Sequence, residues 1–332
     1  MAQLRCGTLT NRGSRVRHSR RVRKSASGSA LPALLLTALL PGAASAPVAA
    51  AAAPPPVPAL PLLDARTVLL VVSPHPDDET LCCAGVMQQV LEAGGRVNVL
   101  WLTSGDGSQL GSLVIERSLF ADPQRMRSYG ARRMAEARTA MDTLGVPAAG
   151  QLFLGYPDGG LLALLTQYRS HPYRARFTQA SAVPYAQALF PGHPYTGETL
   201  ERDFAAVLGR LQPTLILAPS PLDTHPDHHA AGLLAIEAAH TLGSVAVRYW
   251  IVHGGEGWPS PRGLLPGIPL TTPPVAVALA LRPVALTAAE EDRKLAALRD
   301  YQTQMRVMEP FLLAFVRTTE LFAPAPLAAG QR

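Results

Sequence analysis

The chain has 332 residues but few cysteines: Cys6 near its start and the adjacent pair Cys82 and Cys83. So few cysteines exclude the disulfide framework that holds small secreted domains together. Neighbouring cysteines rarely bridge without strain, so we expect Cys82 and Cys83 to be two small, buried, unbridged residues on a helix. A core can form without cross-links at this length, because 48% of the residues are hydrophobic and 16% are charged.

Acidic residues are absent from residues 1–46, although this segment carries eight basic ones: Arg5, Arg12, Arg15, Arg17, Arg20, Arg21, Arg23 and Lys24. Without them, 22 of the 30 basic residues face 24 acidic ones, so the net charge of +6 becomes −2. The basic character therefore belongs to the first segment of the chain. It does not indicate binding to nucleic acid.

A long apolar run is also missing from this first segment. Its apolar core, from Ala30 to Leu40, is too short to span a bilayer comfortably. It follows a basic region and precedes Ala44-Ser45-Ala46, which has the small residues of a cleavage site. We therefore predict an export signal over residues 1–46, by the general or the twin-arginine route, and a periplasmic or extracellular protein without a stable membrane span. An uncleaved N-terminal anchor is the alternative.

The remainder of the chain has neither an internal repeat nor the glycine fingerprint of dinucleotide-binding proteins. Residues 47–62 are rich in Ala and Pro and are predicted to be a linker. Patterns of buried strands at 67–72, 97–102, 151–154, 214–218 and 245–252 alternate with helical patterns at 80–93, 125–144, 198–211 and 228–242. A capping box at Thr287 predicts one more helix, to about residue 305. The alternation predicts a single α/β domain over residues 63–325, with a Rossmann-like, mostly parallel sheet and helices on both faces.

Two histidine-containing loops follow predicted strands. His75-Pro76-Asp77-Asp78-Glu79 follows the first strand, and His225-Pro226-Asp227-His228-His229 follows the fourth. Ligands of parallel sheets bind at the carboxyl ends of the strands, so we expect both loops to meet there, with Asp106 and Asp158. Catalytic zinc takes about three His, Asp or Glu ligands and keeps one position for water. The two loops together predict a zinc site, although either alone could be a helix cap or a polar loop.

These loops resemble those of the PIG-L/LmbE-like family of zinc-dependent N-deacetylases. The resemblance rests on Pro74 to Glu79 and on His225 to His228. It extends to Arg133-Met134-Ala135-Glu136, Leu144-Gly145-Val146 and Leu154 to Gly159. It implies the LmbE-like deacetylase fold and removal of an acetyl group from an N-acetylglucosamine-type sugar or glycoconjugate.

The resemblance also implies roles for individual residues. His75, Asp78 and His228 would bind Zn²⁺, and Asp77 would be the general base. His225 would stabilise the oxyanion, oriented by Asp227. The expected substrate contacts are Arg133, Asp158, Asp106 and His253.

Two other functions stay open on the sequence. One is a broader amidase that acts on a larger acyl group or a thiol-glycoside conjugate, and the other is a non-catalytic carbohydrate-binding protein that keeps the fold. The exact substrate, its acyl group and the oligomeric state do not follow from the sequence. Residues 165–195 and 254–274 are predicted to be loops that line the mouth of the site.

Overall fold

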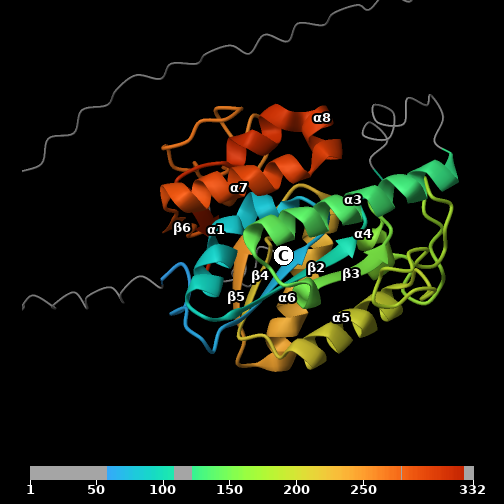
Figure 1. The fold of residues 1–332 in the computed structure, drawn as a ribbon. Coiled ribbons are helices and arrows are strands. Elements are labelled where there is room, and N and C mark those ends of the chain that lie inside the picture. Colours follow the sequence, from blue (N-terminus) through green and yellow to red (C-terminus); the bar gives the residue numbers. More distant parts are fainter. Residues whose placement is uncertain (1–57, 108–121, 278, 325–332) are drawn as a thin grey trace, which may run out of the picture. The chain divides into compact units, whose positions relative to one another are not determined.

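The computed structural model describes residues 58–107, 122–277 and 279–324 (Figure 1). These residues all belong to one unit of the chain, Pro55–Arg332. The predicted export signal and the first part of the predicted linker lie outside the described residues. Within the described ranges, no helix is long and apolar enough to cross a membrane.

The core of this unit is a parallel sheet of five strands in the order β3-β2-β1-β4-β5. The strands are β1 (Val68–Ser73), β2 (Arg96–Thr103), β3 (Gln151–Tyr156), β4 (Leu215–Pro219) and β5 (Ala246–Trp250). Every residue of the central strand β1 is buried, as its continuous apolar sequence predicts. The predicted α/β fold with a parallel sheet is therefore confirmed.

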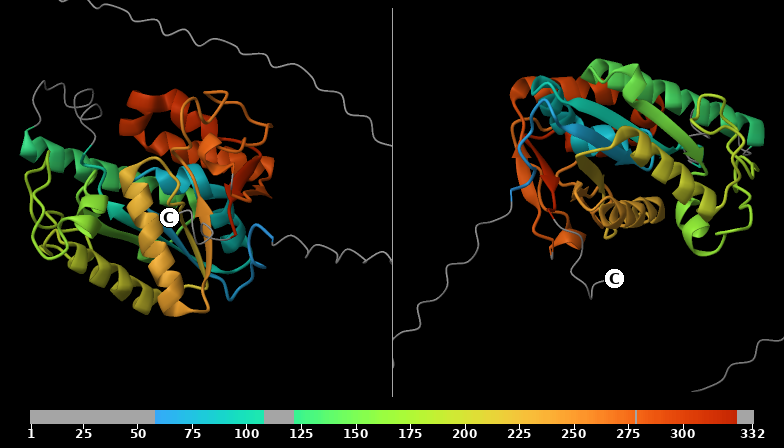
Figure 2. Two further views of the ribbon diagram at one scale, coloured as in Figure 1. Left: turned by 180° about the vertical axis from the view of Figure 1, so that it is seen from behind. Right: turned by 90° about the horizontal axis from the view of Figure 1, so that it is seen from below.

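Helices cover both faces of this sheet (Figure 2). On one face lie α1 (Asp78–Glu92), α3 (Pro123–Leu144) and α7 (Ala288–Asp300), which pack against one another. On the other lie α4 (Leu161–Thr166), α5 (Gly197–Leu211) and α6 (Pro226–Leu242). The change of face follows from the strand order. The chain first moves outward from β1 to β3 and then returns past β1 to β4, and right-handed crossovers put the two sets of helices on opposite sides.

The C-terminal part differs from the single helix expected up to residue 305. Helix α7 ends at Asp300, and α8 (Gln302–Leu312) follows after Tyr301. Helix α8 is itself kinked at Met308 (φ −140°, ψ 31°), two residues before Pro310, because proline removes a backbone donor and clashes with the preceding turn. The remaining elements are the antiparallel pair β6 (Arg282–Ala285) and β7 (Thr319–Phe322), and the short helices η1 (Ala148–Gly150), η2 (Pro274–Ala276) and η3 (Leu313–Phe315).

The segment after β7 returns to the edge of the main sheet. Tyr249 of β5 and Ala323 exchange two backbone hydrogen bonds, of 3.1 and 2.8 Å. The C-terminal end of the described chain therefore covers part of the free side of β5.

The two adjacent cysteines are buried in α1, as expected, but they are joined by a disulfide. The prediction of two unbridged residues is therefore wrong. Their turn of α1 is also held by side chains from outside the helix. Lys294 donates to the carbonyl oxygen of Leu81, and Glu320 accepts from the backbone N–H of Gly85. Backbone groups of this turn thus have partners beyond the helix's own ladder.

Candidate active site

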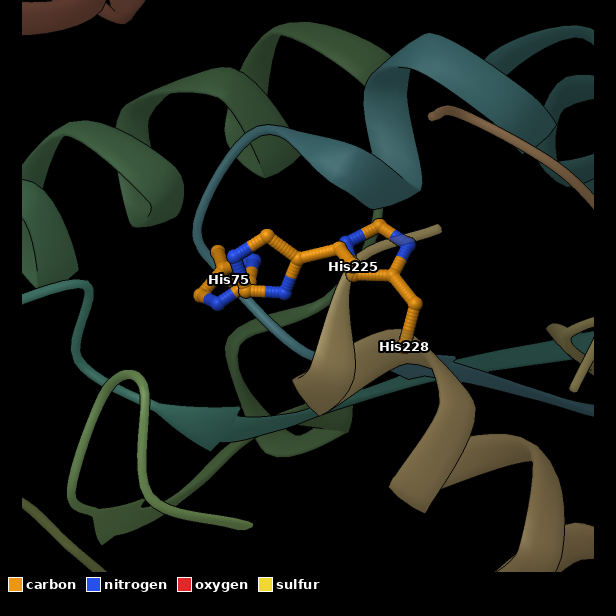
Figure 3. Close-up of side chains that lie close together, drawn as sticks. All are labelled: His75, His225 and His228. Carbon is orange, nitrogen blue, oxygen red and sulfur yellow. The ribbon is translucent and has the colours of Figure 1, made fainter. Parts of the chain in front are cut away.

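The loops after β1 and β4 meet at one edge of the sheet. The two strands are neighbours in the sheet although they are far apart in the chain, so their carboxyl ends form the switch point at which ligands bind in such folds. Figure 3 shows His75 of the first loop beside His225 and His228 of the second. The ring of His75 lies 4.7 Å from that of His225 and 5.3 Å from that of His228, between centroids. His253, just after β5, lies 4.7 Å from His228.

The first loop is anchored by Glu79, which is fully buried. Its carboxylate accepts hydrogen bonds from the indole Nε1 of Trp101 (2.8 Å), from the Tyr301 hydroxyl and from the Ser73 hydroxyl (3.1 Å). It also accepts from the backbone N–H of Asp77 at 3.2 Å, and Asp77 has a φ of 130°, which is rare for a residue with a side chain. Burial raises the pKa of Glu79, although the bonds from Tyr301 and Trp101 act in the opposite direction.

The second loop is anchored by Asp223, which the sequence analysis did not select. Its carboxylate accepts from the backbone N–H groups of His225 (3.0 Å), Val252 (2.9 Å) and His253 (2.9 Å). It also lies 3.1 Å from Nδ1 of His228. Burial acts to raise the pKa of Asp223, but His228 and these donors hold it below its usual range. A carboxylate two residues before His225, at the end of a buried strand, was the available signal.

The groups around His228 fit a metal ion. Oδ2 of Asp78 lies 3.1 Å from Nδ1 of His75 and 3.0 Å from Nε2 of His228. Nε2 of His228 is buried and has no hydrogen-bond partner among the described residues, because its contact with Asp78 lacks hydrogen-bond geometry. Nδ1 of the same ring is held by Asp223, so a neutral ring carries its lone pair on Nε2. Two imidazoles and a carboxylate are the donor set of catalytic zinc.

Other donors are close to the same place. Ligand atoms of His75, His225 and His228 lie within 4.8 Å of one another, as do those of Asp78, His228 and His253. The pKa of His228 is raised to about 9, since the attraction of Asp223 and Asp78 outweighs its burial. A metal ion would therefore displace a proton from this ring.

The carboxylate of Asp77 contacts the guanidinium of Arg133 and not the side chain of Asp78. The guanidinium of Arg133 lies 3.1 Å from Oδ2 of Asp77 and donates to the carbonyl oxygens of Pro76 (2.6 Å) and Gly105 (2.9 Å). Arg133 is only 3% exposed, although it lines the cleft. Its expected contact with sugar hydroxyls stays a prediction. The pKa of Asp77 is raised to about 7, chiefly by burial and also by Asp78, against the effect of Arg133.

The family resemblance implied that Asp227 orients His225. The carboxylate of Asp227, however, does not bind His225. The carboxylate accepts from the backbone N–H groups of Gly159 (2.7 Å) and Leu161 (3.0 Å), and it lies 3.2 Å from Nε2 of His75. Only the backbone N–H of Asp227 reaches His225, by donating to Nδ1 at 3.2 Å. The side chain of Asp227, in the first turn of α6, thus binds the backbone just after β3.

The remaining candidates are distributed between the site and its surroundings. Asp158 lies in the site, with Oδ1 3.3 Å from Nε2 of His75. His253 also lies there, and its pKa is lowered to about 4 by burial and by His228. Asp106 is buried behind the site, where it accepts a 2.6 Å hydrogen bond from the Tyr185 hydroxyl. The expected contact of Asp106 with substrate stays a prediction.

These groups surround a cleft of about 310 Å³. One side is polar and is formed by His75, Asp77, Asp78, Arg133, Asp158, His225 and His253. The other side is mostly apolar and is formed by Leu81, Val252 and, from α8, Gln304, Met308, Phe311 and Leu312. None of the described residues that line the cleft comes from 165–195 or 254–274, the loops expected at its mouth.

Residues 70–239, more than half of the chain, match the family model described as PIG-L: GlcNAc-PI de-N-acetylase. The chain belongs to the PIG-L family. The matched segment runs from β1 into α6 and includes both histidine loops. The family resemblance predicted from the sequence is confirmed.

Individual relatives are deacetylases of acetylated amino sugars. The chain is 29% identical over 286 residues to the 1D-myo-inositol 2-acetamido-2-deoxy-alpha-D-glucopyranoside deacetylase of Tsukamurella paurometabola, across 77% of this chain and 89% of the relative. It is 28% identical to the enzyme of the same name from Kineococcus radiotolerans, across 74% and 71%. Among solved structures it is similar to A40926 pseudoaglycone deacetylase, with 20% identity, a TM-score of 0.48, and coverage of 80% of this chain and 99% of that one.

Proposed function

We propose that the protein is a zinc-dependent hydrolase that removes the N-acetyl group from an N-acetylglucosamine-type sugar or glycoconjugate. Membership in the PIG-L family and the deacetylase relatives support the reaction class. The observation that carries the proposal is the buried Nε2 of His228, which lies 3.0 Å from Asp78 and has no hydrogen-bond partner among the described residues. A group in this state is costly unless it binds something else.

His75, Asp78 and His228 would hold the zinc ion. When bound, zinc lowers the pKa of a water ligand and polarises an amide carbonyl. Asp223 would hold His228 with the correct nitrogen facing the metal, since its carboxylate occupies Nδ1. Asp227 and Asp158 would hold His75 from the side of β3.

Asp77 would act as the general base. It lies in the cleft, it is not among the proposed ligands, and Arg133 and Glu79 fix its side chain and its backbone. A pKa of about 7 suits a group that takes a proton near neutral pH. In the reaction, Asp77 takes a proton from the attacking water as the new C–O bond forms. Asp77 then gives this proton to the nitrogen of the departing amine as the C–N bond breaks, so one water molecule supplies the hydroxyl group of the acid and the new hydrogen of the amine.

His225 would stabilise the negative charge on the amide oxygen. Its Nδ1 accepts a hydrogen bond from the backbone of Asp227, so the proton of the neutral ring is on Nε2. Burial, together with His75 and His228, lowers the pKa of His225 to about 4, which keeps the ring neutral at pH 7. A neutral imidazole with its proton on Nε2 can donate a hydrogen bond to a developing oxyanion.

Zinc content and acetate release, measured together on a panel of N-acetyl sugars, test this proposal. Asp77→Asn should retain zinc and lose on the order of 10²–10⁴ in kcat, because it removes a positioned base. Asp78→Asn should lose zinc affinity and regain part of its activity when zinc is added. His225→Ala should retain zinc and lose about 10²–10³ in kcat.

Two results would contradict the mechanism or the function. A fully active Asp77→Asn protein with a full complement of zinc would exclude Asp77 as the base. If the zinc-loaded wild-type protein releases no acetate from any N-acetyl sugar, the broader amidase or the carbohydrate-binding protein becomes the better hypothesis.

We also propose that the protein is exported and that cleavage after Ala46 leaves a mature chain that begins at Pro47. The support is the order of basic, apolar and small residues in the first 46 positions. Mass spectrometry of protein isolated from its native host should find the Pro47 start in an extracytoplasmic fraction. An intact Met1 start in the cytoplasm would overturn the proposal.

A further inference from the structure

The cleft has an apolar side that hydrolysis of an acetamide does not require. Leu81 lies one turn after Asp78 in α1, and Val252 follows β5. Next to His253, α8 contributes Met308, Phe311 and Leu312. The apolar side therefore begins directly beside the carboxylates and is continuous with the polar side in one cleft.

This apolar wall is fixed in place. Phe311 packs edge-on against Phe315 at 5.3 Å, lies nearly parallel to the ring of His253 at 6.0 Å, and carries the guanidinium of Arg262 at 4.7 Å from its centroid. The kink at Met308 and the proline at 310 interrupt the helix at this point. Met308 and Phe311 are nevertheless only partly buried. Partly exposed apolar side chains in a fixed wall beside a reaction site can pack against a ligand.

A polar group in the same helix also points to a ligand. Gln304 is 4% exposed and lines the cleft. Its Oε1 accepts a 2.9 Å hydrogen bond from the Tyr129 hydroxyl, which assigns the amide nitrogen to the remaining position. Within the described part of the chain, no acceptor for that nitrogen is found. An amide that lines the cleft beside an apolar surface can donate to a substrate that has both a polar and an apolar part.

We propose that α8 forms a subsite for an apolar substituent of the substrate, next to the scissile amide, with Met308 and Phe311 as the residues that determine specificity. This inference rests on the proposed deacetylase function and specifies its substrate class. The substituent could be an acyl chain longer than acetyl or an apolar group on the anomeric oxygen, and both would offer methylene or ring surface to the same wall. Helix α8 lies beyond residues 70–239, the segment that the family model matches.

Two substrate series test the subsite and distinguish the two sources. The first is methyl, butyl and octyl 2-acetamido-2-deoxyglucoside, and the second is N-acetyl-, N-butyryl- and N-octanoylglucosamine. We expect kcat/KM, measured by amine release, to rise about fourfold for each methylene that enters the cleft in one of the two series. A rise in the first series assigns the subsite to the aglycone, and a rise in the second assigns it to the acyl chain.

Variants of α8 test whether the rise of kcat/KM with chain length depends on this helix. Met308→Ala should reduce the ratio of kcat/KM between long and short substrates, and Phe311→Leu should do so without removing the contact with Phe315. Glu309→Ala is the matched control, because Glu309 lies in the same helix but is exposed and does not line the cleft. It should keep the wild-type ratio. An unchanged ratio in both Met308→Ala and Phe311→Leu would overturn the inference.

A binding measurement separates this inference from the proposed function. The methyl and octyl 2-amino-2-deoxyglucosides and the N-octanoyl sugar can be titrated into the zinc-loaded protein by calorimetry, which needs no turnover. Hydrolysis of acetyl sugars without any gain from chain length, in rates or in binding, overturns the apolar subsite and leaves the deacetylase proposal standing. The opposite outcome is absence of hydrolysis together with tighter binding of a long-chain compound that Met308→Ala weakens. It overturns the deacetylase proposal and leaves the apolar subsite standing.

Discussion

The two histidine loops are anchored in different ways. Each contains a buried carboxylate that holds the loop but is not a proposed ligand: Glu79 in the first loop and Asp223 in the second. The side-chain partners of Glu79 are the neutral donors Trp101, Tyr301, Thr80 and Ser73. The carboxylate of Asp223 is instead held by three backbone N–H groups and by the imidazole of His228.

The electrostatic consequence of these partners differs in sign. Burial among neutral donors raises the pKa of Glu79, whereas the bonds to His228 and the backbone hold that of Asp223 low. The first anchor can thus work through hydrogen-bond geometry alone, while the second also supplies negative charge to a proposed zinc ligand. Two loops of similar sequence therefore depend on charge to different degrees.

The largest loss of zinc and activity should follow from replacing the residues that the two loops have in common. Each loop supplies a histidine to the proposed zinc site, so His75→Ala and His228→Ala should both lose bound zinc and nearly all activity. Elemental analysis of the purified variants measures the zinc. His229→Ala is the control, since its ring binds the carbonyl oxygen of Pro221 and does not line the cleft. Full zinc content in both ligand variants would refute the assignment.

Substitution of the two anchors, Asp223 and Glu79, should have smaller effects on zinc affinity, and these effects should differ. Asp223→Asn removes the charge behind His228 and should weaken zinc affinity about 10- to 100-fold, as is typical for groups that hold a metal-binding histidine. Glu79→Gln keeps an acceptor oxygen for Trp101 and should change zinc affinity much less. Competition with a chelator of known affinity measures both variants. Equal losses in the two variants would mean that the two anchors do not differ.

The smallest effect is the dependence of stability on pH in the metal-free protein. Because the folded pKa of Glu79 is raised, its contribution is complete below the unfolded value and is lost as pH rises through the folded value. Glu79→Gln should therefore gain stability relative to wild type with rising pH, by up to about 1.4 kcal/mol per unit between the two pKa values. The contribution of Asp223 has the opposite sign, because its pKa is lowered. It is complete above the unfolded value and lost only in stronger acid. The same carboxylate raises the pKa of His228 to about 9, and this contribution grows as pH falls towards the unfolded value of that ring. The deficit of Asp223→Asn should therefore increase as pH falls from 9 to 6.

Urea unfolding of the three proteins at several pH values measures this difference. A Glu79→Gln protein that loses stability relative to wild type as pH rises would contradict the assignment of a raised pKa.

The polar side of the cleft was largely predictable from the sequence, whereas the anchors and the apolar side were not. Strand patterns predicted that His75 and His225 follow parallel strands of one sheet, and the sheet order makes these strands neighbours. The roles of Glu79 and Asp223 depend on Trp101, Tyr301 and Val252, which come from separate elements that no local pattern connects. The sequence position of Arg133 does not reveal that two of its nitrogens bind the backbone carbonyls of Gly105 and Pro76.

Helix α8 illustrates the same limit in the fold. A continuous helical pattern predicted one helix through residue 305, but the chain breaks at Tyr301, whose hydroxyl binds Glu79 beneath the first loop. That contact joins positions more than 200 residues apart. The break allows α8 to leave the direction of α7 and to present Met308 and Phe311 to the cleft.

The backbone pairing between Tyr249 and Ala323 has a consequence for self-association. Strand β5 is at one end of the sheet, and such a strand offers unpaired N–H and C=O groups to any extended chain. The protein's own segment after β7 occupies part of that position through two hydrogen bonds. A chain shortened before Thr319 would leave this edge open and could add strands from other molecules. The last described residues thus protect the protein against aggregation, although they lie outside the catalytic cleft.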